Sequence, residues 1–127
     1  MMDDSTDFDL VAASLRADSA DLETFVEALA VKLTQSFPAH VTVERRKGWK
    51  PGPRPVQRIT AELGDDRLEL EHEDGRLDCR RRELVRGIAL RSEELELGPW
   101  IDALSRSLVA EAEKSERGRE ALRQLLE

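Results

Sequence analysis

Two histidines and one cysteine are the residues of this 127-residue chain best suited to acid–base or nucleophilic chemistry. The ordinary titration of His40 and His72 falls near neutrality, and Cys79 carries the only thiol. None of the three stands in a recognisable catalytic or phosphate-binding motif. They are also too dispersed to supply the three or four convergent ligands of a metal site. We therefore predict that the protein is not an enzyme and uses no metal and no cofactor.

Both His72 and Cys79 continue apolar strand faces. His72 follows Leu68 and Leu70 at the two-residue spacing of a strand face, and Cys79 follows Leu77 in the same way. We expect His72 to be a sheet or edge histidine rather than a general base. We expect Cys79 to be a small buried hydrophobe rather than a reactive thiol.

Charge is unevenly distributed along the chain. The formal net charge is -7, yet segments 45–58 and 76–91 each contain six Lys or Arg residues. Guanidinium groups suit phosphates and carboxylates, and an exposed tryptophan can stack on a base or anchor a protein partner. The residues predicted to bind a partner are Arg45, Arg46, Lys47, Trp49, Lys50, Arg54, Arg58, Arg80 and Arg82.

Three interpretations of these cations stay open. The arginines can form cross-strand ion pairs with Glu62, Glu69 and Glu71 on the wet faces of neighbouring strands. They can contact a protein partner. They can bind nucleic acid if strand pairing joins them in one patch with the loop around Trp49. The acidic net charge argues against non-specific binding to DNA or membranes, and no apolar run is long enough to span a membrane.

Apolar residues at helical spacing predict two helices near the N-terminus. Residues 7–16 predict a short helix, and Asp18 or Ser19 can cap the next one. That second helix has the clearest periodic signal in the chain, and Pro38 ends it. Its apolar stripe consists of Leu22, Phe25, Val26, Leu29 and Leu33.

A second long stripe runs from Ile101 to Leu125, after a start at Pro99 and Trp100. We expect Trp100 to be a core or interface anchor. Gly118 leaves two alternatives: one long helix, or two helices at roughly 98–114 and 116–126. An unbroken helix of about 37 Å would exceed a small sheet, so its apolar face would need a second copy of the chain. A break would fold the last leucines back onto the same subunit.

Alternating apolar residues in the middle of the chain predict an antiparallel meander. Glycine and aspartate at 64–66 and 74–75 predict tight turns between its strands. The segment Gly48–Pro55 contains three prolines and two glycines among its residues, and we expect an exposed, mobile loop there. The predicted strands include Val41 and Val43, 59–63, 68–72, 77–79 and a short fifth strand at Ile88 and Leu90.

The predicted fold class is therefore α+β. It is a small antiparallel meander sheet of four to five strands, flanked by an N-terminal helix and one long or two short C-terminal helices. We expect a single domain over 1–127, with a disordered tail at 1–6 and helices on one sheet face only. The predicted core comprises Leu22, Phe25, Val26, Leu29, Leu33, Val41, Val43, Ile59, Leu68, Leu70, Leu77 and Leu104.

One stretch resembles a known family. The run Leu84–Leu90, followed by Trp100 and an Ala-rich helix, is similar to the strand-to-helix half of YbaB-type nucleoid-associated proteins. The resemblance covers about a third of the chain. It implies helices flanking a small antiparallel sheet, a dimer, and DNA binding. The proline-rich loop and the extra hairpin depart from that family's pattern.

Taken together, these features predict a non-enzymatic binding or adaptor module that forms a homodimer and binds a protein partner. The alternative is a nucleic-acid-associated protein that uses the central arginines. A lone cysteine cannot form an internal disulfide, and the acidic residues 1–9 do not resemble a signal peptide, so we expect a cytoplasmic protein.

Overall fold

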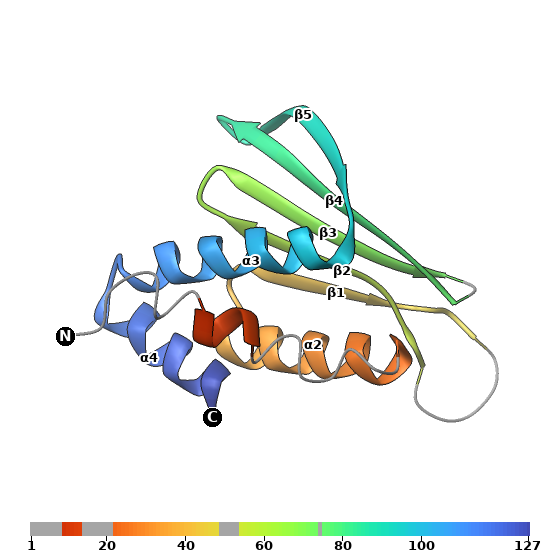
Figure 1. Ribbon diagram of the computed structural model, residues 1–127, viewed down its shortest axis with the longest axis horizontal. Helices are drawn as coiled ribbons and strands as arrows, with labels where there is room; N and C mark the ends of the chain where they lie inside the picture. Colours follow the sequence, from red (N-terminus) through yellow and green to blue (C-terminus); the bar gives the residue numbers. More distant parts are fainter. Residues whose placement is uncertain (1–8, 14–21, 49–53, 74) are drawn as a thin grey trace.

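The computed structural model describes residues 9–13, 22–48, 54–73 and 75–127. Five antiparallel strands form one sheet in the order β1-β2-β3-β4-β5, and the helices pack on one of its faces (Figure 1). This confirms the predicted α+β meander. The elements are α2 (Leu22–Ser36), β1 (Val41–Arg45), β2 (Val56–Leu63), β3 (Asp66–Glu73), β4 (Arg76–Val85), β5 (Ile88–Leu95), α3 (Leu97–Ala112) and α4 (Glu116–Leu126).

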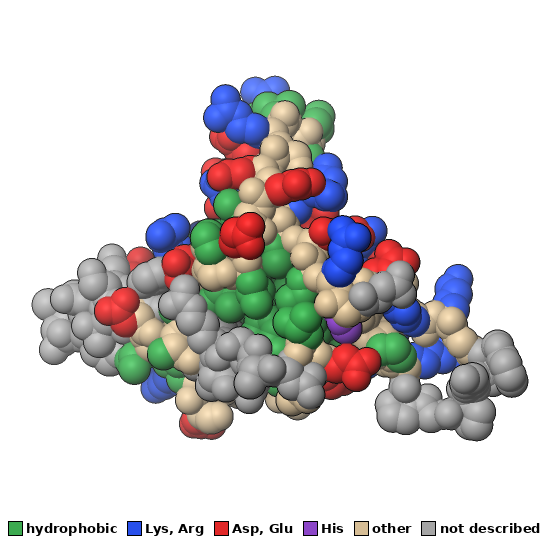
Figure 2. All heavy atoms as spheres, turned by 45° about the vertical axis from the view of Figure 1, so that its right-hand side comes forward, with side chains coloured by type: hydrophobic (Ala, Val, Ile, Leu, Met, Phe, Trp, Pro, Cys, Tyr) green, Lys and Arg blue, Asp and Glu red, His purple; other side chains and the backbone are tan. Residues whose placement is uncertain are grey.

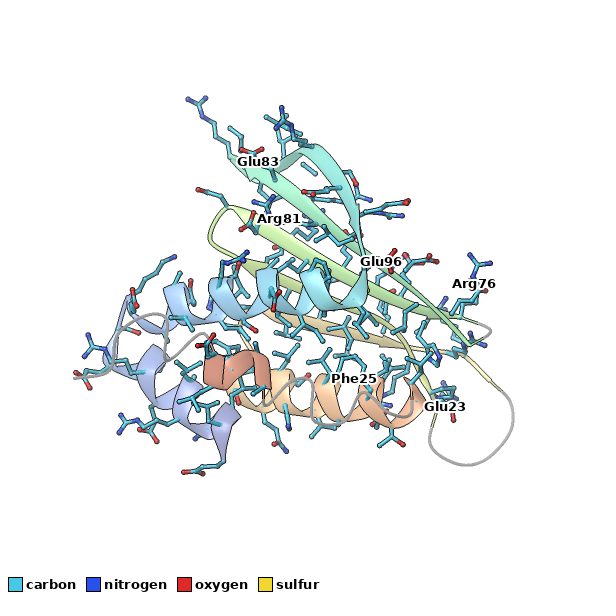
Figure 3. The ribbon with its side chains drawn as sticks, viewed as in Figure 1. Glu23, Phe25, Arg76, Arg81, Glu83 and Glu96 are labelled. Atoms are coloured by element: carbon cyan, nitrogen blue, oxygen red, sulfur yellow. The ribbon has the colours of Figure 1, made fainter. Side chains whose placement is uncertain are left out.

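The predicted stripe of α2 packs against the sheet. Phe25, Leu29 and Leu33 are at most 2% exposed, and Phe25 projects from the helix towards the strands (Figure 3). The helix ends at Ser36, just before Pro38, as predicted. Residues 9–13 are also helical; the rest of the expected 7–16 helix and the expected cap at 18–19 lie outside the described residues.

One face of the sheet is buried and the other is wet, because strand register aligns the apolar residues. Ile59 pairs with Leu70 and Ala61 pairs with Leu68, and all four are fully buried. Most of the predicted core is buried in the same way. Three predicted core residues are only half-buried and lie at the margin: Leu22, Val43 and Leu77.

Each of the last three connections between strands has backbone in the left-handed region. Gly64 adopts a φ of 60° between β2 and β3, Gly75 one of 74° between β3 and β4, and Arg86 and Gly87 adopt 53° and 80° between β4 and β5. Two consecutive positive φ values are typical of the type I′ turn, whose twist matches that of a β-hairpin. The turn at Arg86 thereby fixes the register of the β4–β5 hairpin, in which Val85 pairs with Ile88.

The hairpin of β4 and β5 is longer than the sequence predicted. The expected fifth strand was short, around Ile88 and Leu90, but β5 continues to Leu95. Residues 91–94 are charged or polar, so they show no apolar alternation. Figure 1 shows that the outer half of the hairpin extends beyond α3. Six of the eight residues of β5 are exposed, so the strand does not need an apolar alternation.

The C-terminal stripe is divided into α3 and α4, and α4 folds back against α3 and α2. The hydroxyl of Ser115 caps α4 by accepting a hydrogen bond from the Gly118 amide at 3.0 Å. Leu122 and Leu125 are buried within the same chain, at 8% and 2% exposure. The two-helix alternative is confirmed, and the apolar stripe therefore no longer requires a second copy.

Gly118 has a packing role that propensity alone does not show. A Cβ atom at this position would lie 2.9 Å from the Glu111 carbonyl oxygen and 3.0 Å from Cα of Ala112. The two helices can approach this closely only because Gly118 lacks a side chain. No helix in the described part of the chain combines the length and the apolar character needed to cross a membrane.

Replacing Phe25 by alanine should lower the free energy of unfolding by about 3–5 kcal/mol, because a buried ring is removed and a cavity remains. A urea melt monitored by circular dichroism measures this loss. A change near zero would contradict the placement of Phe25 in the core.

Replacing Gly118 by alanine should destabilise the protein by roughly 1–3 kcal/mol, because the new methyl group collides with the backbone of α3. Gly98 in α3 is the matched control, since no atom lies within 4 Å of a Cβ built there. Gly98→Ala should be neutral or stabilising in the same melt. A Gly118→Ala variant as stable as the wild type would refute the close helix contact.

Candidate functional site

The arginines predicted on the sheet strands are engaged in cross-strand ion pairs. Arg58 Nη2 lies 2.7 Å from Glu71 Oε1. Arg82 Nε lies 3.2 Å from one oxygen of Glu69, and Arg80 Nη1 lies 3.8 Å from the other. The interpretation as cross-strand ion pairs is confirmed for these three arginines.

These pairs belong to a mixed charge array on the outer face, which is the sheet face opposite the helices. Glu69 is only 13% exposed and serves two arginines. Arg67 pairs with Glu62 at 2.6 Å. Glu71 lies opposite Arg58 and Glu69 opposite Arg80, while Arg67 lies opposite Arg82, so basic and acidic side chains are mixed on this face. The outer face carries Glu44, Glu62, Glu69, Glu71, Asp78 and Glu94 among Arg58, Arg67, Arg80 and Arg82.

Arg45 lies on the other side of the sheet from Arg80 and Arg82. Its guanidinium group donates to both carboxylate oxygens of Glu27 in α2, at 2.9 and 2.8 Å, and to the carbonyl of Arg54 at 2.9 Å. The hydrogen bond from Arg45 holds the pKa of Glu27 below its usual value. The structure therefore does not bring Arg45 into one patch with the arginines of β4.

The remaining predicted cations are near the base of the 48–55 loop. Arg46 donates from its side chain to the His72 carbonyl at 3.4 Å, while Lys47 and Arg54 are exposed. Trp49 and Lys50, like most of the loop expected to be mobile, lie outside the described residues. Next to the loop base is a hollow of about 520 Å³, lined by Glu23, Val26, Glu27, Arg54, Pro55, Val56 and His72.

Cys79 is buried, as predicted, at 5% exposure. His72 lies in the sheet, in β3, as expected, and is also buried at 8% exposure. Burial raises the pKa of the Cys79 thiol to about 11, so the thiol stays protonated at neutral pH. Trp100 is fully buried, and its indole N–H donates to the carbonyl of Arg80 at 3.3 Å. Trp100 is therefore a core anchor that joins α3 to β4.

The structure also forms a histidine–carboxylate pair that the sequence did not predict. His40 Nε2 lies 3.2 Å from Glu111 Oε1, beside a cleft of about 700 Å³ between the C-terminal end of α2 and the α3–α4 corner. Lys114 also binds Glu111, at 3.0 Å. The one feature of the sequence that could have indicated this pair is Glu111, a charged residue within the apolar stripe of α3. Among the described residues, no group of three or more His, Cys, Asp or Glu is arranged to hold a metal ion.

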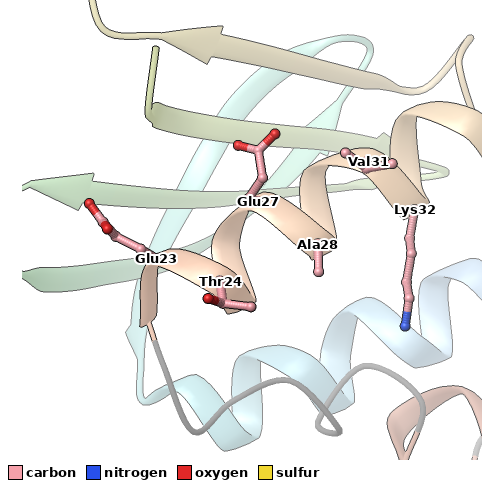
Figure 4. A pocket seen from close by; sticks show the side chains of 6 residues that line it. All are labelled: Glu23, Thr24, Glu27, Ala28, Val31 and Lys32. Carbon is pink, nitrogen blue, oxygen red and sulfur yellow. The ribbon is translucent and has the colours of Figure 1, made fainter. Parts of the chain in front are cut away.

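Two further hollows flank the helices. One, of about 580 Å³, lies on α2 between side chains that include Glu27, Val31 and Lys32 (Figure 4). The other, of about 440 Å³, separates α3 from β4 and β5 and is polar. In it, Arg81 Nη2 lies 2.8 Å from Asp66 Oδ1. The described residues that line these shallow sites form no constellation of nucleophile and base.

The two most exposed large hydrophobic side chains in the described chain, Ile88 and Leu90, lie at the end of the β4–β5 hairpin together with Val85. Val85, Ile88 and Leu90 are 45%, 64% and 66% exposed and are called the hairpin tip below. Figure 2 shows hydrophobic and basic side chains together at this outer end. The exposed residues Arg86 and Arg91 lie beside the tip in sequence. Such a surface can dock on an apolar partner with a polar rim.

Comparison with known proteins gives no match: no family model, no curated protein and no solved structure corresponds to this chain. The resemblance to YbaB-type proteins therefore stays a prediction based on residues 84–90 and Trp100.

The buried thiol gives a pH-dependent prediction. The folded protein holds the Cys79 proton up to about pH 11, whereas the unfolded thiol loses it near 9.0. Stability from this group is complete below pH 9 and should be lost as the pH rises towards 11. The slope of unfolding free energy against pH should therefore be steeper for the wild type than for Cys79→Ala. In addition, an aromatic disulfide reagent should modify native Cys79 far more slowly than the unfolded chain. Equal rates would show that the thiol is accessible.

Proposed function

We propose that this protein is a non-enzymatic binding module that docks a protein partner on the hairpin tip. The observation that supports this function most directly is the grouping of Val85, Ile88 and Leu90 on one protruding hairpin at 45–66% exposure. Apolar side chains gathered in this way are more favourable against a partner than in water.

The hairpin is well organised for docking before a partner arrives. Its turn is closed by Arg86 and Gly87, and its strands are joined by ion pairs on both faces. Arg80 approaches Glu94 at 4.0 Å on the outer face, and Arg81 approaches Glu93 at 3.8 Å on the helix side. A preorganised surface loses less conformational entropy when it binds.

The charge pattern supports a protein partner over nucleic acid. Binding to a phosphate backbone depends on many cations that are free to displace counterions. Arg58, Arg80 and Arg82 instead lie among carboxylates of the outer face. The nucleic-acid alternative is left with exposed cations such as Lys47 and Arg54 near the loop base and Arg86 and Arg91 beside the hairpin tip, and it stays a prediction.

A double variant tests the proposed docking surface. Ile88→Lys with Leu90→Lys should leave the melting temperature nearly unchanged, because both side chains are already exposed, and should abolish partner capture. The experiment compares tagged wild type and variant as baits in lysate of the native cells, with and without nuclease. Val31→Lys is the matched control, because Val31 is 40% exposed on α2, away from the hairpin.

Loss of captured protein with the hairpin variant, but not with Val31→Lys, supports the proposal. Equal capture by all three baits would contradict it. Capture that depends on nucleic acid and survives the hairpin substitutions would favour the alternative function.

A further inference from the structure

The strand β5 forms one edge of the sheet and pairs only with β4 among the described strands. An edge strand presents unpaired backbone N–H and C=O groups, which can pair with another strand. We propose that two copies of this protein join their sheets by antiparallel pairing of β5 with β5, with Ser92 facing Ser92 across a two-fold axis. The inference builds on the proposed docking role of the hairpin and identifies a second copy as the occupant of its free edge.

Symmetry restricts the possible registers. A two-fold axis normal to the sheet keeps the helix-covered faces of both copies on one side, so residues of the same face must lie opposite each other. Side chains alternate between faces along a strand. The axis must therefore pass through a residue paired with its own symmetry mate. The residues near the centre of β5 through which the axis could pass are 90 to 94.

Charge then selects one register. An axis through Arg91, Glu93 or Glu94 would place that residue opposite its own copy, which is unfavourable for like charges. An axis through Ser92 instead pairs Arg91 with Glu93 twice. No like charges oppose each other in this register, because Ala89 then lies opposite Leu95 and Leu90 lies opposite Glu94.

An axis through Leu90 is also free of opposed like charges but gives a poorer ladder. It would pair only residues 88–92. It would also be centred where the β4–β5 register shifts, since Glu83 pairs with Arg91 while Leu84 pairs with Ala89. The axis through Ser92 allows a ladder over residues 89–95 whose centre is regular, since Arg82 pairs with Ser92 and Arg81 with Glu93, and the shift between Ala89 and Arg91 falls only towards the ends of that ladder.

The charged side chains of β5 discourage pairing with other strands, but in the register centred on Ser92 they are complementary between the two copies. Arg91 and Glu93 lie on the same face of β5, and both are exposed. Natural sheets use charges on edge strands against indiscriminate pairing. Here the same charges oppose the shifted registers and favour the symmetric one, while Val85 and Ile88 stay near the two ends of the joint sheet.

Charge exchange between copies tests the pairing. Wild type should be a dimer at tens of micromolar by analytical ultracentrifugation. Arg91→Glu alone and Glu93→Arg alone should each weaken dimerisation roughly tenfold or more, because two attractive pairs become repulsive. An equimolar mixture of the two variants should restore dimers, since the strand with two acidic side chains then faces the strand with two basic ones. A wild-type monomer, or a mixture as weak as its components, would overturn the inference.

A cross-link tests the register itself and does not depend on the stability of the charge variants. With Cys79 replaced by alanine, Ser92→Cys should form an intermolecular disulfide under mild oxidation, because opposite Cα atoms in an antiparallel ladder lie within disulfide range. Leu90→Cys, the matched control, should not. Cross-linking by Leu90→Cys and not by Ser92→Cys would overturn the inference. A negative cross-linking result would contradict the β5–β5 dimer but not the docking of a partner on the hairpin tip. That docking is tested separately by the capture assay with Ile88→Lys and Leu90→Lys.

Discussion

Burial of one sheet face beneath α2 and α3 is the interaction on which the rest of the structure depends. The cross-strand pairs Ile59–Leu70 and Ala61–Leu68 present a fully apolar surface to the helices. Once that surface is covered, α4 must close the remaining side of the helical layer. The outer half of the β4–β5 hairpin projects beyond α3 and has no helix over it (Figure 1).

Patterns that report burial predicted most of this arrangement. The stripe of α2, the strands β1 to β4 and the buried positions of Cys79 and Trp100 could all be derived from spacing, because the apolar side chains in these segments recur at the positions that are buried. The length of β5 could not be derived in this way. Residues 91–94 form a strand through backbone hydrogen bonds to β4. When both faces of a strand are exposed to solvent, such pairing requires no alternation of apolar and polar residues, so the sequence does not indicate it.

The candidate site was predicted only in part, for a similar reason. Sequence identifies a cluster of arginines but does not show which carboxylates lie opposite them. The register brings Glu69 between Arg80 and Arg82, and tertiary packing brings Glu27 to Arg45. His40 and Glu111 meet because the fold brings the last turn of α3 beside the residue that precedes β1. Pairs of this kind depend on topology, and no local pattern encodes them.

The hydrogen bond from the Trp100 indole to the Arg80 carbonyl, at 3.3 Å, has a mechanical consequence. It lies near the middle of β4, between the part of the strand held under the helices and the part that projects. Tilting of the projecting part would rotate the Arg80 peptide plane and thereby change the polarity around a fully buried indole. Because β4 would pivot beside this ring, the fluorescence of Trp100 in a Trp49→Phe variant could report motion at a distant surface without an added label.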